Sequence, residues 1–330
     1  MTDPASPKSG PARSLLRGID PAMATAFACI VVLLLVGAII NPNFLSPDYL
    51  LTQLQVASFL ALMSTGMMLV ILLGQIDLSL PWIITVGGMM STAAAGWDHE
   101  WGPVIAMPVG VLCGVLFGVI NGIGVAYLRV PSMIFTLGIN AVAQGFMIVR
   151  TGGAAPQDMA PDSMHDLATG RFVLGLIPNP LWVWIVVGGI TVFLLRRTIF
   201  GRAIYAIGNR EVAAYLSGIN TQRVVLAVFA ISGGLAAFAG TLLAGYSTKA
   251  YQGMGDPYLL PAIAAVVLGG TSILGGRGTY LGTVAGVILI TLLQSILSVI
   301  QIEEAFRQLI YGAVIVAMLL LYGRGAKVAA

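Results

Sequence analysis

Charged residues are scarce in this sequence. Asp, Glu, Lys and Arg together make up 9% of the 330 residues, whereas a soluble domain usually carries about 25%. Apolar residues make up 58%, and the mean hydropathy is +0.95. Water cannot wet a surface so poor in charge, so most of it must face lipid or other helices. We therefore predict an integral membrane protein with a single membrane domain over residues 21–323.

Residues that commonly bind metals or carry catalysis are few as well. The two cysteines, Cys29 and Cys113, lie in apolar runs, and the two histidines, His99 and His165, have no further ligands at metal-binding spacing. None of the three lysines lies in a G-x-x-x-x-G-K-[ST] segment that could hold nucleotide phosphates. We expect no catalytic residue, no metal site, no bound cofactor and no nucleic-acid partner. If ATP and Mg drive this protein, they bind a separate ATPase chain.

Long apolar runs are plentiful. Helices are the only plausible spanning element for them, because helices satisfy their own backbone groups in lipid. The sequence thus predicts an all-α bundle of about ten spans, of which the third and sixth are short. The runs fall at roughly 23–40, 52–74, 82–96, 103–127, 131–149, 180–195, 224–246, 258–274, 280–300 and 306–322.

The basic residues predict the orientation of these spans. With ten crossings and the N-terminus inside, twelve of the sixteen basic residues fall on the cytoplasmic side, as the positive-inside bias requires. Both termini are then cytoplasmic, with a disordered tail at 1–20 and a short tail at 324–330. The cytoplasmic set is Lys8, Arg13, Arg17, Arg129, Arg196, Arg197, Arg202, Arg210, Arg223, Arg277, Arg324 and Lys327, and the outer set is Arg150, Arg171, Lys249 and Arg307.

Glycines recur every fourth residue along the fourth predicted span, at Gly110, Gly114, Gly118 and Gly122. Residues at this spacing share one helix face. Small residues on one face let two helix backbones approach closely in a membrane. The ladder therefore predicts tight helix packing rather than contact with a solute.

Asp77 is the one acidic residue set between two apolar runs, in the segment GQIDLSLP at 74–81. A carboxylate near membrane depth is a functional candidate, because leaving it in lipid is costly. The same residue could instead cap the third span by accepting its first N–H groups, with Ser79 and Pro81 as helix-start signals. We favour the cap and keep Asp77 as a candidate for the translocation path.

Other polar side chains fall inside the predicted spans. Thr136, Asn140 and Gln144 recur every four residues and share one face of the fifth span, and Gln294 lies in the ninth. Such a stripe could line a path for a neutral hydroxylated solute, or it could form hydrogen bonds between helices. Both interpretations remain open at this point.

The loop 196–223 contains the signals of a short helix outside the membrane. Asn209 is a strong N-cap residue, Glu211 favours the first turn, and Gly218 stands where a helix commonly ends. The spacing predicts a helix of about eight residues, roughly 12 Å long. Its small and apolar side chains need a partner surface. The residues assigned to this short helix and its ends are Asn209, Glu211, Ala213, Ala214, Leu216, Ser217 and Gly218.

Five segments together resemble the membrane permeases of ATP-binding-cassette importers, specifically the ribose/xylose/arabinose-type sugar permease family. The resemblance runs from about residue 45 to 322. The segments are GQIDLSL at 74–80, VPSMIFTLG at 130–138, TGG at 151–153, the stretch from FGR to GI at 200–219, and AIAAVVLGGTSILGGRG at 262–278.

The resemblance implies a permease of the bacterial inner membrane that imports a monosaccharide or related polyol. It implies two permease chains, identical or different, paired with two ATPase subunits inside and one solute-binding protein outside. The short helix at about 209–218 would then dock on the ATPase, and the long outer loop 150–178 would help seat the binding protein. Import of nucleosides or branched-chain amino acids is the alternative within this architecture. An ion-coupled secondary transporter ranks lower, because Asp77 is its only ionisable candidate.

Overall fold

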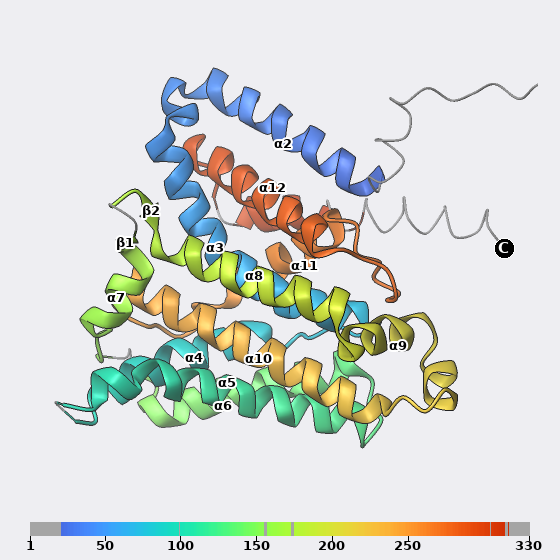
Figure 1. Cartoon of the computed structure of the whole chain (residues 1–330). Coiled ribbons are helices and arrows are strands. Elements are labelled where there is room, and N and C mark those ends of the chain that lie inside the picture. The colour runs from blue at the N-terminus through green and yellow to red at the C-terminus, as the bar shows by residue number, and fades with distance from the viewer. Residues whose placement is uncertain are drawn as a thin grey trace, which may run out of the picture.

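The computed structural model describes residues 21–98, 100–154, 157–172, 175–303, 305–313 and 316. The tails predicted at 1–20 and 324–330, and His99, lie outside the described residues. The described part is a bundle of helices, as predicted, and its paired strands are two residues each (Figure 1). The elements are α2 (Pro21–Ile40), η1 (Pro42–Leu45), α3 (Pro47–Leu72), α4 (Leu80–Ala95), α5 (Gly102–Ala126), α6 (Ser132–Thr151), α7 (Asp162–Thr169), β1 (Arg171–Phe172), β2 (Ile177–Pro178), α8 (Asn179–Arg197), α9 (Ile199–Leu216), α10 (Thr221–Tyr246), η2 (Asp256–Tyr258), α11 (Leu259–Leu268) and α12 (Tyr280–Val299).

Six of the described helices are long and apolar enough to cross a membrane: α3, α5, α6, α8, α10 and α12. The sixth predicted run is therefore longer than expected, because α8 has 19 residues. The third run is short, as expected, since α4 has 16 residues and a length of about 24 Å at 1.5 Å per residue. Further apolar segments below the spanning length are Thr25–Ile40 and Asp256–Leu268.

The predicted eighth span, 258–274, is not one continuous helix. α11 has ten residues, a length of about 15 Å, or half of a hydrocarbon core of about 30 Å. The helix ends at Gly269 and Gly270, of which Gly270 has φ +88°, a conformation that glycine adopts without steric cost. The chain continues as the loop 269–279, which packs against other parts of the protein. Irregular backbone at membrane depth is tolerated where protein buries it.

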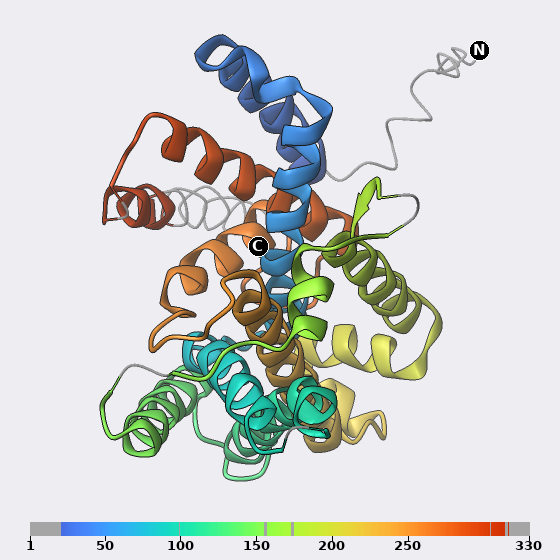
Figure 2. The same cartoon turned by 90° about the vertical axis from the view of Figure 1, so that its left-hand side faces the viewer.

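The centre of the bundle is built on close contacts between α4, α5 and α10. The glycine ladder of α5 lies against α4 and α10. A Cβ added at Gly114 or Gly118 would collide with main-chain atoms of α10, and one at Gly122 would lie 2.7 Å from Leu226 Cα of the same helix. Gly233 of α10 in turn meets Gly114. The ladder thus sits where two backbones touch, which is the arrangement that small-residue spacing favours. Figure 2 shows α10 at the centre of the bundle with α4 and α5 beside it.

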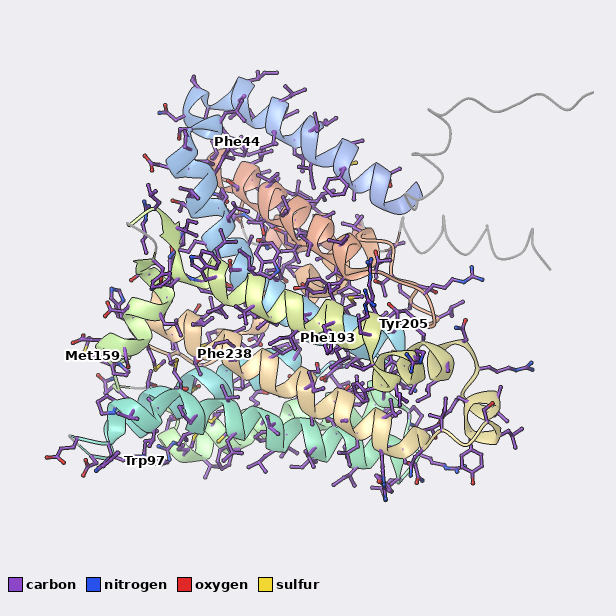
Figure 3. The ribbon with its side chains drawn as sticks, viewed as in Figure 1. Phe44, Trp97, Met159, Phe193, Tyr205 and Phe238 are labelled. Atoms are coloured by element: carbon purple, nitrogen blue, oxygen red, sulfur yellow. The ribbon has the colours of Figure 1, made fainter. Side chains whose placement is uncertain are left out.

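The two ends of the bundle differ in the elements that they carry. At one end, here called the α9 end, lie α9 and the connections 74–79, 127–131 and 269–279. At the other, the α7 end, lie α7, the β1–β2 pair and the connections 96–101 and 247–255 (Figures 1 and 2). Tyr205 is labelled at the α9 end in Figure 3, and Trp97 and Met159 at the α7 end. A bridge between Met159 and Lys249 ties two connections of the α7 end together.

Charge separates between these ends. Among the described residues, those at the α9 end are Arg129, Arg196, Arg197, Arg202, Arg210, Arg223 and Arg277 with Asp77 and Glu211; those at the α7 end are Arg150, Arg171, Lys249 and Arg307 with Asp48, Asp98, Glu100, Asp158, Asp162, Asp166, Asp256 and Glu303. At Asp98, hydrogen bonds from the main-chain N–H groups of Trp101 and Glu100 hold the pKa of the carboxyl below its usual range. The α9 end is basic and the α7 end is acidic.

Candidate functional site

The segment predicted as a short helix is part of α9, which consists of two helices joined at a break. Arg210 has an extended backbone (φ −164°, ψ 100°), so the helix breaks there and residues 211–216 form a separate short helix. Asn209 was predicted as the N-cap of this helix, and that prediction is wrong by one residue. The side chain of Asn209 donates instead to the main-chain oxygens of Tyr205 (2.9 Å) and Gly276 (3.4 Å).

The end of the short helix has the predicted form. Gly218 has φ +85°, and its N–H donates to the main-chain oxygen of Tyr215, while the N–H of Ile219 donates to that of Ala214. The side chain of Ser217 donates to the main-chain oxygen of Ala213 (2.9 Å). A left-handed glycine after the last helical residue satisfies carbonyls that would otherwise lack partners.

One face of the short helix has no covering within the described chain. Val212, Tyr215 and Leu216 are 69%, 67% and 79% exposed, and Glu211 and Ala213 are also exposed. Ala214 is only 4% exposed and faces the protein. Large apolar side chains gathered at the basic end of the molecule indicate a surface that meets another protein.

The first part of α9 is bound to the loop 269–279 and to the end of α3. Besides the Asn209 contact, the hydroxyl of Tyr205 donates to the main-chain oxygen of Gly278 (2.9 Å), and the N–H of Gly276 donates to that of Leu72 (3.0 Å). Gly208 packs so tightly here that an added Cβ would lie 2.5 Å from the nitrogen of Gly276. We call Leu72, Tyr205, Gly208, Asn209, Gly276 and Gly278 the α9 junction. It connects α9 to α3, α11 and α12.

Asp77 lies in the connection between α3 and α4 and is 1% exposed. Its Oδ1 accepts hydrogen bonds from the N–H (2.9 Å) and the hydroxyl (2.5 Å) of Ser79, the residue before α4 begins. The Ser79 hydroxyl also accepts from the Asn121 side chain of α5 (2.7 Å). This geometry is that of a turn leading into a helix.

The polar stripe of α6 reaches the same connection. Thr136 Oγ1 accepts from the N–H of Leu78 (2.9 Å) and Asn140 Oδ1 from that of Trp82 (3.4 Å). Ser132, one turn earlier, accepts from the N–H of Ile76 (3.3 Å). Gln144 is exposed and does not join them. Of the two interpretations left open, these contacts favour hydrogen bonding between helices, because the acceptors satisfy backbone donors at the start of α4.

Gln294 lies far from these residues, on α12 near the α7 end. It lines a groove of about 480 Å³ between α3, α12, η2 and the helical segment 305–313. The candidate path residues therefore divide into two groups: Asp77, Thr136 and Asn140 around the start of α4, and Gln294 in this α3–α12 groove.

Sequence reasoning missed most of the residues that line this groove. On α12, Thr291, Gln294, Ser295 and Ser298 follow the i, i+3, i+4, i+7 pattern of one helix face. This spacing of polar residues could have been recognised in the sequence. On α3, Tyr49 and Gln53 face it, but nothing in the sequence shows that α3 and α12 lie side by side there.

A bundle of apolar helices with a basic end, an exposed short helix and a polar groove defines a multi-pass membrane protein of the transporter class. The chain belongs to the family described as "Branched-chain amino acid transport system / permease component", whose model matches residues 49–319. It is thus a transport permease and a multi-pass protein of the inner membrane.

Several curated relatives match over most of the chain. The ribose import permease protein RbsC of Haemophilus influenzae is 36% identical over 299 residues, which are 89% of this chain and 91% of that protein. RbsC of Bacillus subtilis is 34% identical over 297 residues, with the same coverage. The L-arabinose ABC transporter permease protein AraH of Azospirillum brasilense is 32% identical over 284 residues, which are 84% of this chain and 81% of that protein. No solved structure matches the chain.

Proposed function

We propose that this chain is the permease subunit of an ATP-binding-cassette importer for a monosaccharide or related polyol. The relatives named for ribose and arabinose import support the solute class. The observation that carries the proposal is the exposed short helix 211–216 at the basic end, joined to three membrane helices by the α9 junction. A transporter that binds no nucleotide itself needs such a surface to receive mechanical work.

The proposed topology has ten crossings with both termini in the cytoplasm. Elements α2, α3, α4, α5, α6, α8, α10, α11 and α12 follow one another between the two ends of the bundle, and the helical segment 305–313 begins the proposed tenth crossing. α2 starts at the α9 end (Figure 1), so an even number of crossings returns the chain to that end. Because basic residues concentrate at the α9 end, that end faces the cytoplasm. α11 completes its crossing as the loop 269–279.

Three kinds of protein partner follow from this topology. ATPase subunits, which use ATP and Mg, dock on Val212, Tyr215 and Leu216 at the cytoplasmic end. A solute-binding protein docks on the acidic α7 end, where Asp158, Asp162 and Asp166 are exposed. A second permease chain completes the path. The chain itself binds no cofactor and performs no hydrolysis.

Closure of the ATPase pair would then push the short helix and move the helices attached to it. The α9 junction passes this displacement directly to the end of α3, because Gly208 packs against the main chain of Leu72. It reaches α11 and α12 through the loop 269–279 that joins them, because Tyr205 and Asn209 donate hydrogen bonds to main-chain oxygens of this loop. Packed backbones transmit such shifts as rigid elements with two discrete arrangements.

The test is uptake of radiolabelled D-ribose, L-arabinose and D-xylose into proteoliposomes that contain this chain. The complete system also contains the cognate ATPase, the solute-loaded binding protein, and ATP on the side of the membrane that the ATPase faces. With all of these present, we expect uptake of at least one of these sugars. Without the ATPase we expect none. Uptake by the permease alone, or no uptake of any of the three by the complete system, would contradict the proposal.

A further inference from the structure

The α3–α12 groove has the dimensions and chemistry of a binding site. Its volume of about 480 Å³ lies within the range of about 300–1,000 Å³ that small-molecule sites occupy. Polar side chains line it from two facing helices: Tyr49 and Gln53 from α3, and the Thr291 to Ser298 stripe from α12. Polar groups at the depth of a membrane helix are costly unless they pair or serve a ligand.

Several of these polar groups have no partner in the part of the chain that the structure describes. Thr291 is 3% exposed, and its hydroxyl, which has almost no contact with solvent, makes no hydrogen bond there. The side-chain amides of Gln53 and Gln294 make none either. A buried hydroxyl without a partner costs about 1–3 kcal/mol. Thr291 shares this property with Thr283, but only Thr291 lines the groove, beside two amides that are free to bond a ligand there.

Other hydroxyls of the groove already have hydrogen-bond partners. The Tyr49 hydroxyl and the Ser295 hydroxyl are 2.5 Å apart and join α3 to α12. The Ser298 hydroxyl donates to the main-chain oxygen of Gln294 (2.8 Å). The Tyr49–Ser295 contact thus fixes the two walls relative to each other, and neither contact uses the side-chain amides of Gln53 and Gln294.

The charges of the groove select the class of ligand. No lining residue in the described part of the chain is acidic, and Arg307 is the charged one; its Nε donates to the main-chain oxygen of Ile302 (2.9 Å). An amino acid would therefore bring its ammonium group to a site without a carboxylate. Amides and hydroxyls both donate and accept, and such groups match the alternating donors and acceptors of a sugar.

We propose that the α3–α12 groove binds the transported solute, a neutral polyhydroxylated molecule, through Gln53, Thr291 and Gln294. This inference rests on the proposed function. The groove lies at the α7 end, which the proposed topology places outside, so it would receive solute from the binding protein. Pro257 and Tyr258 of η2 also line it, and η2 leads directly into α11, whose far end meets the α9 junction. Movement at the short helix thus reaches the groove through α11 and α12.

The test measures ATP-driven D-ribose uptake in the complete proteoliposome system, with L-arabinose and D-xylose in parallel. Gln294→Leu, Gln53→Leu and Thr291→Val are compared with Thr283→Val. Thr283 is the matched control, because it lies on the same helix, is 1% exposed, and has a hydroxyl without a partner in the described chain, yet it does not line the groove. ATPase activity stimulated by the binding protein shows that each variant is folded and assembled.

Each groove variant is expected to lower uptake about 5- to 10-fold, the effect of losing one hydrogen bond worth about 1 kcal/mol or slightly more. The stimulated ATPase activity and the Thr283→Val variant should stay near the wild type. If the wild type takes up sugar and the groove variants take it up equally well, the groove assignment is wrong and the proposed function stands. The same holds if Thr283→Val loses as much uptake as the groove variants. If Gln294→Leu loses its stimulated ATPase activity, its uptake says nothing about solute binding. The test then depends on Gln53→Leu, on the opposite wall, which must show the loss of uptake. If the wild type takes up none of the three sugars, the proposed function fails, and the groove assignment with it.

Discussion

The side-chain amide of Asn209 donates a hydrogen bond to the main-chain oxygen of Gly276, although 67 residues separate them in the chain. Asn209 is the last residue before the break at Arg210, and Gly276 lies in the loop between α11 and α12. The bond therefore ties the residue that precedes the break and the exposed short helix to the loop that joins two membrane elements. In the proposed importer it lies on the route between the ATPase and the solute groove.

Replacing Asn209 with alanine should uncouple part of the transport cycle. The variant loses the bonds to Gly276 and Tyr205, which are worth about 1 kcal/mol each, while the helices themselves keep their own hydrogen bonds. We expect sugar uptake per ATP hydrolysed to fall about 2- to 5-fold, measured in proteoliposomes. Ser217→Ala is the control, because its hydroxyl bonds only within the short helix. An unchanged ratio in Asn209→Ala would remove this bond from the coupling route.

Gly218 offers a separate test of the short helix. Proline cannot adopt φ +85° and lacks the N–H that Gly218 donates to Tyr215, so Gly218→Pro should unwind the end of the helix. Membrane insertion should be unaffected, and uptake should fall below about a tenth of the wild type, as for a loss of more than about 1.4 kcal/mol. Asparagine tolerates the left-handed conformation, so Gly218→Asn should keep most of the uptake. Equal activity in both variants would count against docking through this helix.

The sequence was most informative where local chemistry decides the structure. Gly218 ends its helix as predicted because a left-handed residue is a local requirement. Asn209 was misassigned because its side chain bonds to a loop that is distant in sequence, while the backbone of Arg210 breaks the helix. α11 ends early because Gly270 turns the chain, although apolar residues continue beyond it.

The candidate site was predictable only in part, for the same reason. Gln294 could be chosen as a polar residue within a span, and its neighbours Thr291, Ser295 and Ser298 could have been found by helical spacing. Their function as a groove depends on α3 packing opposite them, which spacing along one helix does not specify. Conversely, the spacing of Thr136 and Asn140 correctly placed them on one face, but only the structure shows that this face meets the start of α4.

Thr136 should contribute to stability through the bond that it accepts from Leu78. Thr136→Val keeps the shape of the side chain but leaves that backbone N–H without its acceptor, at a cost of about 1–3 kcal/mol. Thermal unfolding of the purified permease in detergent should therefore occur at a lower temperature. Gln144→Leu, at the exposed end of the same stripe, should leave the unfolding temperature unchanged. The opposite order of effects would contradict the assignment of this stripe to helix contacts.

Asp77 should act through its oxygen atoms rather than its charge. Asparagine can still accept the bonds from the N–H and hydroxyl of Ser79, so Asp77→Asn should retain uptake within about twofold, a change of less than about 0.5 kcal/mol. Asp77→Ala cannot accept them and should lower stability by about 1–2 kcal/mol, measured by thermal unfolding together with uptake. A large loss of uptake in Asp77→Asn with normal stability would show that the carboxylate itself is needed.

Gly118 should be among the least replaceable residues of the bundle. A Cβ at this position would meet the main-chain oxygen of Phe229 and lie 3.0 Å from Ala230 Cα, and α5 and α10 have no flexible side chain there that could move aside. Gly118→Ala should force the two backbones apart and destabilise the protein by about 1–3 kcal/mol, seen as a lower unfolding temperature and less protein in the membrane fraction. Gly138→Ala on α6 is the matched control, because nothing lies within 4 Å of its added Cβ. Since alanine favours a helix over glycine by about 1 kcal/mol, that variant should be as stable as the wild type or more so. If both variants behave alike, the spacing of the ladder reflects helix composition alone and the close approach of α5 to α10 is not what holds the centre together.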